Sequence, residues 1–150
     1  MPEELTFPSE DWFTRLAAFM SADESSFRRL GPIDCSMVVK VGTTDEAALF
    51  EVTFEAFEVK SIRRLEHIED AAQEHFVIEA TFDTWREMIE NIHAHGEPDL
   101  AHTLNYLTFP DDPMVVGGPD QLQIDAFYRY NQSLQRFFNG AARVATRYAQ

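Results

Sequence analysis

FVIEATFDTWREMIENI, residues 76–92, changes its pattern of apolar side chains halfway along. Phe76, Ile78 and Ala80 alternate with their neighbours, as in a strand that buries one face. After Asp83 the apolar residues recur at spacings of three, four and seven, which is typical of one buried face of a helix. The members of this helical stripe are Trp85, Met88, Ile89 and Ile92. This stretch therefore predicts a strand that leads directly into a buried helix.

Asp83 lies where the period changes, and it is predicted to be the N-cap of a helix that begins at Thr84. An aspartate side chain accepts hydrogen bonds from the first free N–H groups of a helix, and its charge is favoured at the positive end of the helix dipole. Arg86, Glu87 and Glu90 fall on the other side of this helix. The helix is therefore expected to pack on the sheet through its apolar stripe.

The residues before this stretch predict a helix followed by two antiparallel strands. Ser9 is expected to cap the helix, which ends or breaks near residues 21–26 or is extended by a turn with Phe27 and Leu30. It stops before Gly31-Pro32, because proline disfavours a helical conformation in the residue before it. Residues 33–41 alternate as a half-buried strand, and the turn sequence at residues 42–45 predicts a return strand. The return strand has Phe50, Val52, Phe54 and Ala56 facing the core and Glu51, Thr53 and Glu55 facing outward.

Two segments between the return strand and residue 76 leave alternatives open. At Ala56-Phe57 the apolar register shifts by one residue, which predicts a β-bulge, a bend or the start of another strand. Residues 61–74 carry charges of both signs and little periodicity, so a short helix and a third strand with a loop are both expected alternatives. The sequence leaves the connection into the central strand undetermined.

The C-terminal third predicts mostly helix. Pro98 is expected at the first position of a short helix that ends near residue 107, followed by a loop at residues 109–113 and a brief last strand at residues 114–116. From residue 119 to 148 the apolar residues recur at gaps of three and four, which predicts a long helix. Because a helix of that length would extend roughly 45 Å, it must protrude or break. The break is expected at Asn139-Gly140, since glycine is a poor helix former.

Composition and charge exclude several classes of partner. The 150 residues include 13 phenylalanines, 2 tryptophans and 4 tyrosines, so either the core is aromatic or an apolar molecule is held inside it. A formal charge of −14 repels phosphate backbones and anionic membrane surfaces. Nucleic acid is therefore not expected as a partner. No apolar run approaches the roughly 20 residues of a membrane span, so integral membrane insertion is not expected either.

Cys35 is the single cysteine and cannot form an internal disulfide. Its position among Ile33, Met37 and Val39 predicts burial as a small apolar residue. The first residues are acidic, where a secretory signal would be basic. A reduced, cytoplasmic setting is therefore expected.

The order of these elements resembles the sterol carrier protein 2-like family. The resemblance is carried by a strand that ends in a polar turn, by Asp83-x-Trp85 with its apolar helix, and by the short helix at residues 98–107. It continues through Met114-Val-Val-Gly-Gly-Pro-Asp120, similar to the family's final strand and Gly-Asp pair, although Pro119 separates the two residues here. A C-terminal helix follows, so the resemblance covers nearly the whole chain.

The resemblance implies an α+β fold, with about five mostly antiparallel strands covered on one face by helices. It implies that residues 1–150 form one such domain, with an apolar tunnel between the two layers. The function implied is non-catalytic binding and carriage of an apolar small molecule such as a sterol, a fatty acyl chain or a similar lipid. The inward positions expected to line the tunnel are Phe50, Val52, Phe54, Met88, Ile92, Phe127, Leu134 and Phe137.

Three alternatives compete with a carrier. The histidines His93, His95 and His102 lie near Glu97 and Asp99, but they follow a helix and are predicted to be a polar surface loop, with no bound metal. A cone-shaped isomerase or hydratase would need an acid/base pair in an apolar pocket, and the residues available for it are Asp34, His75, Glu79 and Asp83. An interaction module would present the Phe-rich last helix to a partner or a second copy as a homodimer. No catalytic residue and no cofactor is predicted.

Two further features receive ordinary structural interpretations. Cys35 has no histidine in an activating pattern nearby, so a nucleophilic role is not expected. Arg129, Arg136 and Arg143 repeat every seven residues, with Arg147 one turn beyond. They would suit an anionic headgroup or a carboxylate, but a solvated helix face is the commoner meaning of such spacing.

Overall fold

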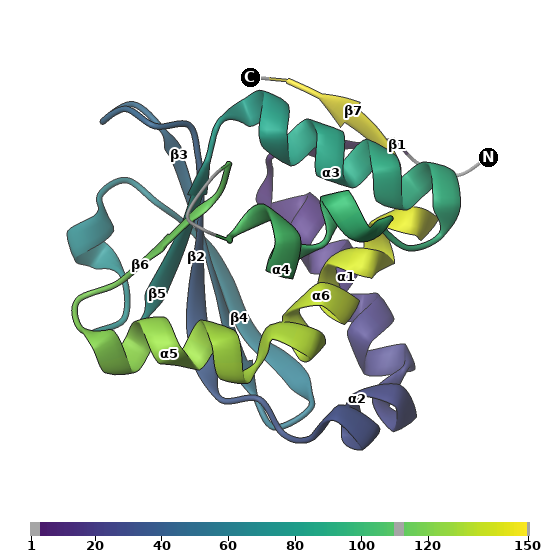
Figure 1. Ribbon diagram of the computed structural model, residues 1–150, viewed down its shortest axis with the longest axis horizontal. Coiled ribbons are helices and arrows are strands. Elements are labelled where there is room, and N and C mark those ends of the chain that lie inside the picture. The colour runs from purple at the N-terminus through teal and green to yellow at the C-terminus, as the bar shows by residue number, and fades with distance from the viewer. Residues whose placement is uncertain (1–3, 110–112, 150) are drawn as a thin grey trace.

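The computed structural model of the chain describes residues 4–109 and 113–149. Its centre is a mixed sheet of five strands in the order β4-β3-β2-β5-β6 (Figure 1). The strand β2 runs parallel to β5, and the remaining neighbours are antiparallel. The bounds are β2 Cys35–Val41, β3 Ala48–Glu55, β4 Glu58–Leu65, β5 Phe76–Ala80 and β6 Val115–Gly117.

The α-helices cover one face of this sheet, as Figure 1 shows, and the connection between β4 and β5 lies on the other side. The helices are α1 Glu10–Ala22, α2 Glu24–Leu30, α3 Phe82–His95, α4 Leu104–Leu107, α5 Gln121–Arg129 and α6 Asn131–Asn139, with 3-10 turns η1 Ile68–Asp70, η2 Leu100–His102 and η3 Gly140–Arg143. The predicted α+β class, with a mostly antiparallel sheet and helices on one face, is confirmed.

The central strand and helix form as the sequence predicts. Phe76, Ile78 and Ala80 face the helices from β5, and the whole stripe of α3 is buried against them. Trp85 also donates a hydrogen bond from its indole Nε1 to the backbone oxygen of Lys40, at 3.0 Å. Burial of the stripe and this one directional bond therefore hold α3 on the sheet beside β2.

The N-cap of α3 is Thr81, so the prediction of Asp83 as the cap is wrong. The hydroxyl of Thr81 accepts a hydrogen bond from the N–H group of Thr84, and the helix begins at Phe82. The chain leaves the strand one residue earlier than its apolar pattern indicates, because Phe82 turns into the core as the first helical residue. Asp83 lies in the first turn, where its charge still suits the helix dipole.

Of the two other predicted helix N-termini, one is confirmed and one is wrong. Ser9 caps α1 as predicted, with its hydroxyl accepting a hydrogen bond from the N–H group of Trp12. Pro98 is not the first helical residue, because Asp99 caps η2 and α4 begins only at Leu104. Of the predicted loop at residues 109–113, positions 110–112 lie outside the described residues.

The long C-terminal helix is divided into two helices and ends early. The chain breaks at Tyr130 between α5 and α6, and α6 ends at Asn139, the break predicted from Asn139-Gly140. Gly140 lies so close to α1 that a Cβ atom there would approach Leu16 Cδ2 at 3.1 Å. Glycine at this position therefore permits the close packing of two helices.

A strand that the sequence analysis missed follows the break. The strand β7, Ala145–Tyr148, pairs in parallel with β1, Glu4–Phe7, as a separate two-stranded sheet. The prediction that the strand near residue 115 is the last one is therefore wrong. Because β1 and β7 are each only four residues long, their alternation is too short to distinguish from the end of a helix.

The undetermined segment after β3 is a hairpin followed by a loop. Ala56 adopts a left-handed backbone conformation, with φ of 58°, and the chain turns there into β4. The start of another strand at Ala56-Phe57 is thus correct, while the register irregularity itself lies earlier, between Thr53 and Phe54. Residues 61–74 contain the rest of β4 and a loop with η1, in agreement with the strand-and-loop alternative.

The face of the sheet turned away from the helices carries a small second core of Val38, Leu49 and Leu65. Glu51 is on this face with only 2% of its surface exposed, so its predicted outward, solvent-facing position is wrong. It accepts hydrogen bonds from Arg63 Nε and from the N–H group of Ala72, each at 2.6 Å. The loop between β4 and β5 folds back over the strand and covers the carboxylate.

Candidate functional site

The eight residues predicted to line a tunnel all lie in one buried cluster between the sheet and the helices. None exposes more than 2% of its surface. They come from β3, α3, α5 and α6, and several are in direct ring contact with other aromatic residues. The rings of Phe54 and Phe137 meet edge to face with centroids 5.2 Å apart, and Phe50 packs on Phe13 at 5.3 Å. The structure therefore brings the eight together as packed core, and their role as ligand lining stays a prediction.

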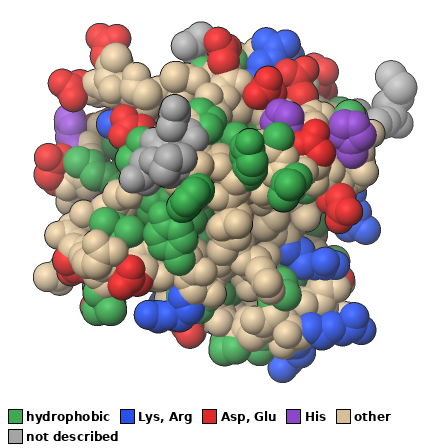
Figure 2. Space-filling view, in the orientation of Figure 1, with side chains coloured by type: hydrophobic (Ala, Val, Ile, Leu, Met, Phe, Trp, Pro, Cys, Tyr) green, Lys and Arg blue, Asp and Glu red, His purple; other side chains and the backbone are tan. Residues whose placement is uncertain are grey.

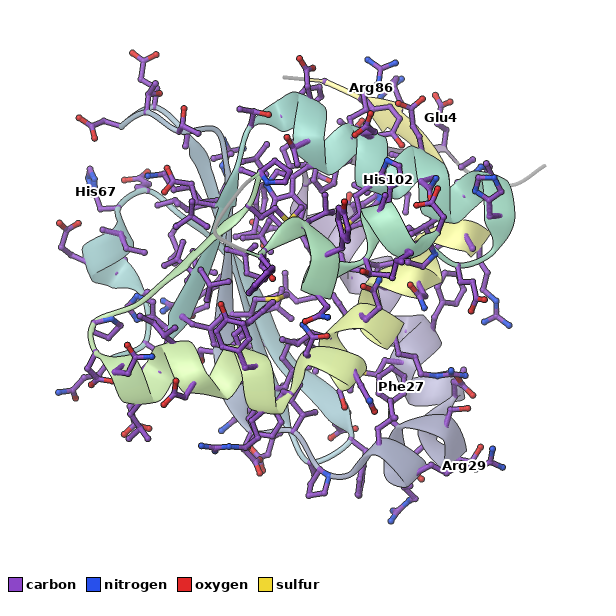
Figure 3. All side chains as sticks on the ribbon, viewed as in Figure 1. Glu4, Phe27, Arg29, His67, Arg86 and His102 are labelled. Carbon is purple, nitrogen blue, oxygen red and sulfur yellow. The ribbon has the colours of Figure 1, made fainter. Side chains whose placement is uncertain are left out.

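A hollow of about 450 Å³, here called the α6 hollow, opens between α1, α2 and α6. Its floor consists of buried apolar side chains, among them Leu16, Met20, Phe27 and Phe137. Phe27 reaches from α2 into the space beside α6 (Figure 3). Because Phe137 belongs both to this floor and to the predicted lining, the hollow extends from the surface to the core.

Charged groups surround the mouth of the α6 hollow. Arg136 Nη2 lies 3.0 Å from Asp23 Oδ2, and the guanidinium of Arg143 lies over the ring of Phe19, 5.1 Å from its centroid. The pKa of Asp23 is lowered, mainly because the Ser26 hydroxyl donates a hydrogen bond to it and further because of Arg136. The mouth therefore offers an ion pair and a second cation above an apolar floor.

A second hollow of about 660 Å³, the α5 hollow, lies at the end of the sheet, where α5 and residues 72–74 of the β4–β5 loop meet the ends of β2 and β3. Buried Phe54 and Ala126 lie at its apolar side, and Arg129 is among its polar residues. Cys35 is also part of this lining, but burial, with a smaller contribution from the charge of Asp34, raises the pKa of its thiol to about 12. A thiol that stays protonated at neutral pH is a poor nucleophile.

A third hollow of about 420 Å³, the outer hollow, lies on the face of the sheet away from the helices. Leu49 and Val77 form its apolar part, and the ion pair of Lys40 and Glu79, at 3.3 Å, crosses it. It touches none of the eight predicted lining residues. We therefore place the candidate site at the α6 and α5 hollows, which both reach the core.

The arginine stripe of the last segment is split among different places. Arg136 and Arg143 meet at the α6 hollow, whereas Arg129 belongs to the α5 hollow. Arg147 lies in β7, where it donates a hydrogen bond to the hydroxyl of Thr6 at 3.0 Å. The seven-residue spacing was the sequence signal for Arg136 and Arg143. The break between α5 and α6 determines that these two arginines share a hollow while Arg129 lies at another.

The histidine segment does not assemble a metal site among the described residues, where no three His, Cys, Asp or Glu side chains are placed to hold an ion. His102 Nδ1 lies 2.6 Å from Asp99 Oδ1, and His95 Nδ1 lies 3.0 Å from the backbone oxygen of Asn91. The hydrogen bond from His102 is the main cause that lowers the pKa of Asp99. These contacts serve the end of α3 and the start of η2.

The residues considered for an acid/base pair are not brought together in a pocket. Asp34 accepts a hydrogen bond from the N–H group of Ala56, Glu79 pairs with Lys40, and Asp83 is in the first turn of α3. His75 Nδ1 lies 2.7 Å from the backbone oxygen of Ala72. Over residues 4–109 and 113–149, the buried polar or charged residues are Ser36, Glu51, Thr108 and Ser133.

The Phe-rich face of the last segment is covered by the chain itself. Phe127, Phe137 and Phe138 each expose 1% of their surface or less, so they are not presented to a partner as the interaction-module alternative requires. The apolar side chains that gather on the face seen in Figure 2 lie over α4, β6 and α5. Exposed apolar residues of these three elements are Tyr106 on α4, Val115 on β6, and Leu122 and Tyr128 on α5.

Comparison with solved structures identifies the fold. A crystal structure of sterol carrier protein 2 superposes with a TM-score of 0.66 at 17% sequence identity, covering 91% of this chain and 98% of that one. The solution structure of TT1886 from Thermus thermophilus, a conserved hypothetical protein described as a candidate sterol carrier protein, gives 0.66 at 19% identity, covering 93% and 90%. The chain therefore has the fold of sterol carrier protein 2.

No protein-family profile matches the chain, and no curated protein is significantly similar to it in sequence. The resemblance stated from the motifs is confirmed at the level of structure. Within the described residues, no helix combines the length and the apolar character needed to cross a membrane.

Proposed function

We propose that residues 1–150 form one sterol carrier protein 2-like domain that binds and carries an apolar small molecule, such as a sterol, a fatty acyl chain or a similar lipid. The observation that carries this proposal is the α6 hollow. It opens at the surface, and its floor at Phe137 belongs to the aromatic layer between sheet and helices. The fold shared with sterol carrier protein 2 supports the same function.

The physical basis of such binding is burial of apolar surface. Each square ångström removed from water contributes roughly 25 cal/mol, and few polar groups are available inside to select one ligand. Because the eight residues belong to one packed core cluster, a ligand that passes beyond the floor must separate helices from the sheet. Met20 and Met88 lie in this region, and methionine adapts its shape more easily than branched residues do.

The proposal involves no reaction, metal or cofactor. The net charge of −14 disfavours nucleic acid and anionic membranes as partners, which leaves an apolar small molecule as the proposed partner. A reduced, cytoplasmic setting for the single cysteine, Cys35, is part of the proposal. A homodimer stays a prediction, and the native mass spectrometry described in the next paragraph would detect it.

The first test is native mass spectrometry of freshly purified protein, which detects a retained lipid and the oligomeric state together. The second is a titration with a fluorescent fatty acid, for which we expect micromolar affinity, on the order of −8 kcal/mol. The emission of Trp85, buried beside the same core, should change on binding. If folded protein retains no lipid and binds no sterol, acyl chain or probe at high micromolar concentration, the proposal fails.

Two variants locate the binding. Phe19 is half-buried at the mouth of the α6 hollow, so Phe19→Glu places a charge at the entrance with little risk to the fold. We expect affinity to fall about tenfold or more, because a charged group is costly beside an apolar ligand. The matched control is Ile68→Glu, which places the same charge at the outer hollow and should leave affinity unchanged. Equal loss in both variants would contradict binding at the α6 hollow.

A further inference from the structure

The α6 hollow and the α5 hollow each contain one ring of an aromatic pair that is in direct contact. Phe137 lines the α6 hollow, Phe54 lines the α5 hollow, and neither residue exposes more than 2% of its surface. Their rings meet edge to face, with centroids 5.2 Å apart and planes at 87°. We propose that Phe54 and Phe137 form a gate, and that turning these rings aside joins the two hollows into one passage between the sheet and the helices.

The two residues belong to different layers, so the gate lies where a ligand would have to pass. Phe54 is on β3 beside the register shift of the β3–β4 hairpin, two residues before the turn at Ala56. Phe137 is in the last turn of α6, three residues before Gly140. Both are therefore near the ends of their elements, where regular backbone pairing gives way to turns. A change in the separation of α6 from β3 would open the gate without breaking the centre of the sheet.

The shape and polarity of the joined passage define its ligand class. The two hollows, about 450 and 660 Å³, each fall within the usual range for small-molecule sites. The ring pair is apolar, whereas the α6 hollow holds Arg143, Glu97 and the ion pair of Arg136 with Asp23, and the α5 hollow holds Arg129 with Asp34 and Glu74. We therefore assign the passage to an unbranched acyl chain whose tail crosses between the rings and whose anionic head stays at Arg143, over the ring of Phe19.

The gate would set a preference for chain length, an inference that rests on the carrier function proposed above. A short acyl chain can occupy one hollow with the rings in contact. A long chain requires the open state, so its apparent affinity is reduced by the fraction of molecules in which the gate is open. Loosening the ring contact should therefore strengthen binding of long chains and leave short chains unaffected.

The test compares decanoate and hexadecanoate on wild type and on three Phe→Leu variants, by isothermal titration calorimetry. Phe54→Leu and Phe137→Leu remove the ring contact. Phe7→Leu is the matched control, because Phe7 is equally buried and packs on another ring, that of Trp12 at 4.8 Å, but lines none of the three hollows and is not among the eight predicted lining residues. Urea denaturation of all three checks that the variants are folded.

We expect hexadecanoate to bind about 2- to 10-fold more tightly to both gate variants, a range set by the usual strength of an aromatic pair. Decanoate affinity should stay at the wild-type value, and Phe7→Leu should change neither. If the gate variants change both fatty acids alike, or if Phe7→Leu gives the same gain, the gate is wrong while the carrier function stands. If no protein in the series binds either fatty acid, the carrier function itself fails, and the gate with it.

Discussion

The two faces of the sheet bury their residues by different means, and neighbouring residues of β3 show the contrast. Phe50 faces the helices and is fully buried, in ring contact with Phe13. Glu51 faces the other way and is 2% exposed, but its carboxylate is held by Arg63 and by the N–H group of Ala72. Phe50 is thus buried by apolar contact without directional bonds, whereas Glu51 is buried as a charged group with specified partners.

This difference indicates on which face of the sheet a ligand can replace the contacts between side chains. Apolar contacts are not directional, so an apolar molecule can replace the side chains of the helix layer at modest cost. The loop over Glu51 has no such freedom, because moving it would leave a buried carboxylate and a backbone N–H group without partners. We therefore propose that ligand exchange takes place on the helix side, with the loop side as a fixed wall.

The largest expected effect is on the helix side. Phe50→Ala should lower the free energy of unfolding by about 3–5 kcal/mol, because it removes a buried ring and leaves a cavity. Urea denaturation followed by circular dichroism measures the change. A loss below about 1 kcal/mol would mean that the helix layer is not closely packed on the sheet, and would remove the basis of the comparison.

A smaller effect is expected on the loop side. Glu51→Ala should cost about 1–3 kcal/mol, because the N–H group of Ala72 loses its acceptor inside the protein. The control is Glu55→Ala on the same strand, which should cost less, since the ion pair of Glu55 with Lys60 is solvent-exposed on both sides. Amide hydrogen exchange at Ala72 should accelerate in Glu51→Ala alone. Unchanged exchange there would show that the carboxylate does not hold the loop.

The third prediction concerns the free energy of unfolding at alkaline pH, which depends on two residues that pack on the helix side of the sheet. Its effect at neutral pH is the smallest of the three. Burial raises the pKa of Cys35 from 9.0 to about 12, and burial, followed by the charge of Glu90, raises that of Tyr148 from 10.0 to about 12. Both groups ionise more readily in the unfolded chain, so their contribution to stability is complete below about pH 9 and is lost as pH rises toward 12.

Urea midpoints measured from pH 8 to pH 11 test this prediction. Wild type should lose stability over that interval, and the loss should be reduced in Cys35→Ala and in Tyr148→Phe, which cannot ionise at those positions. The Glu51→Ala variant should keep the full alkaline loss. If Cys35→Ala and Tyr148→Phe lose as much stability at alkaline pH as wild type does, other ionisable groups cause the loss and the prediction is wrong.

Local pattern was sufficient for much of the fold. The strand and helix at residues 76–92, the Ser9 cap and the turn after β2 follow from spacings and residue types within a few positions. These features depend on backbone period and on short-range hydrogen bonds, which the sequence specifies directly. The resemblance to sterol carrier protein 2-like domains came from the same order of elements, and the solved structures confirm it as a fold.

The sequence by itself therefore determined most elements of the central sheet and of the helix layer, and the inward position of all eight residues placed in the core, but neither β7 nor the burial of Glu51. Only the tertiary structure decided which distant segments meet: the pairing of β1 with β7, the loop over Glu51, and the contact of Phe54 with Phe137 between two hollows. The physical reason is that an apolar pattern specifies that a side chain leaves water but not which side chain it meets. Which side chains come into contact is determined by the packing of the whole chain.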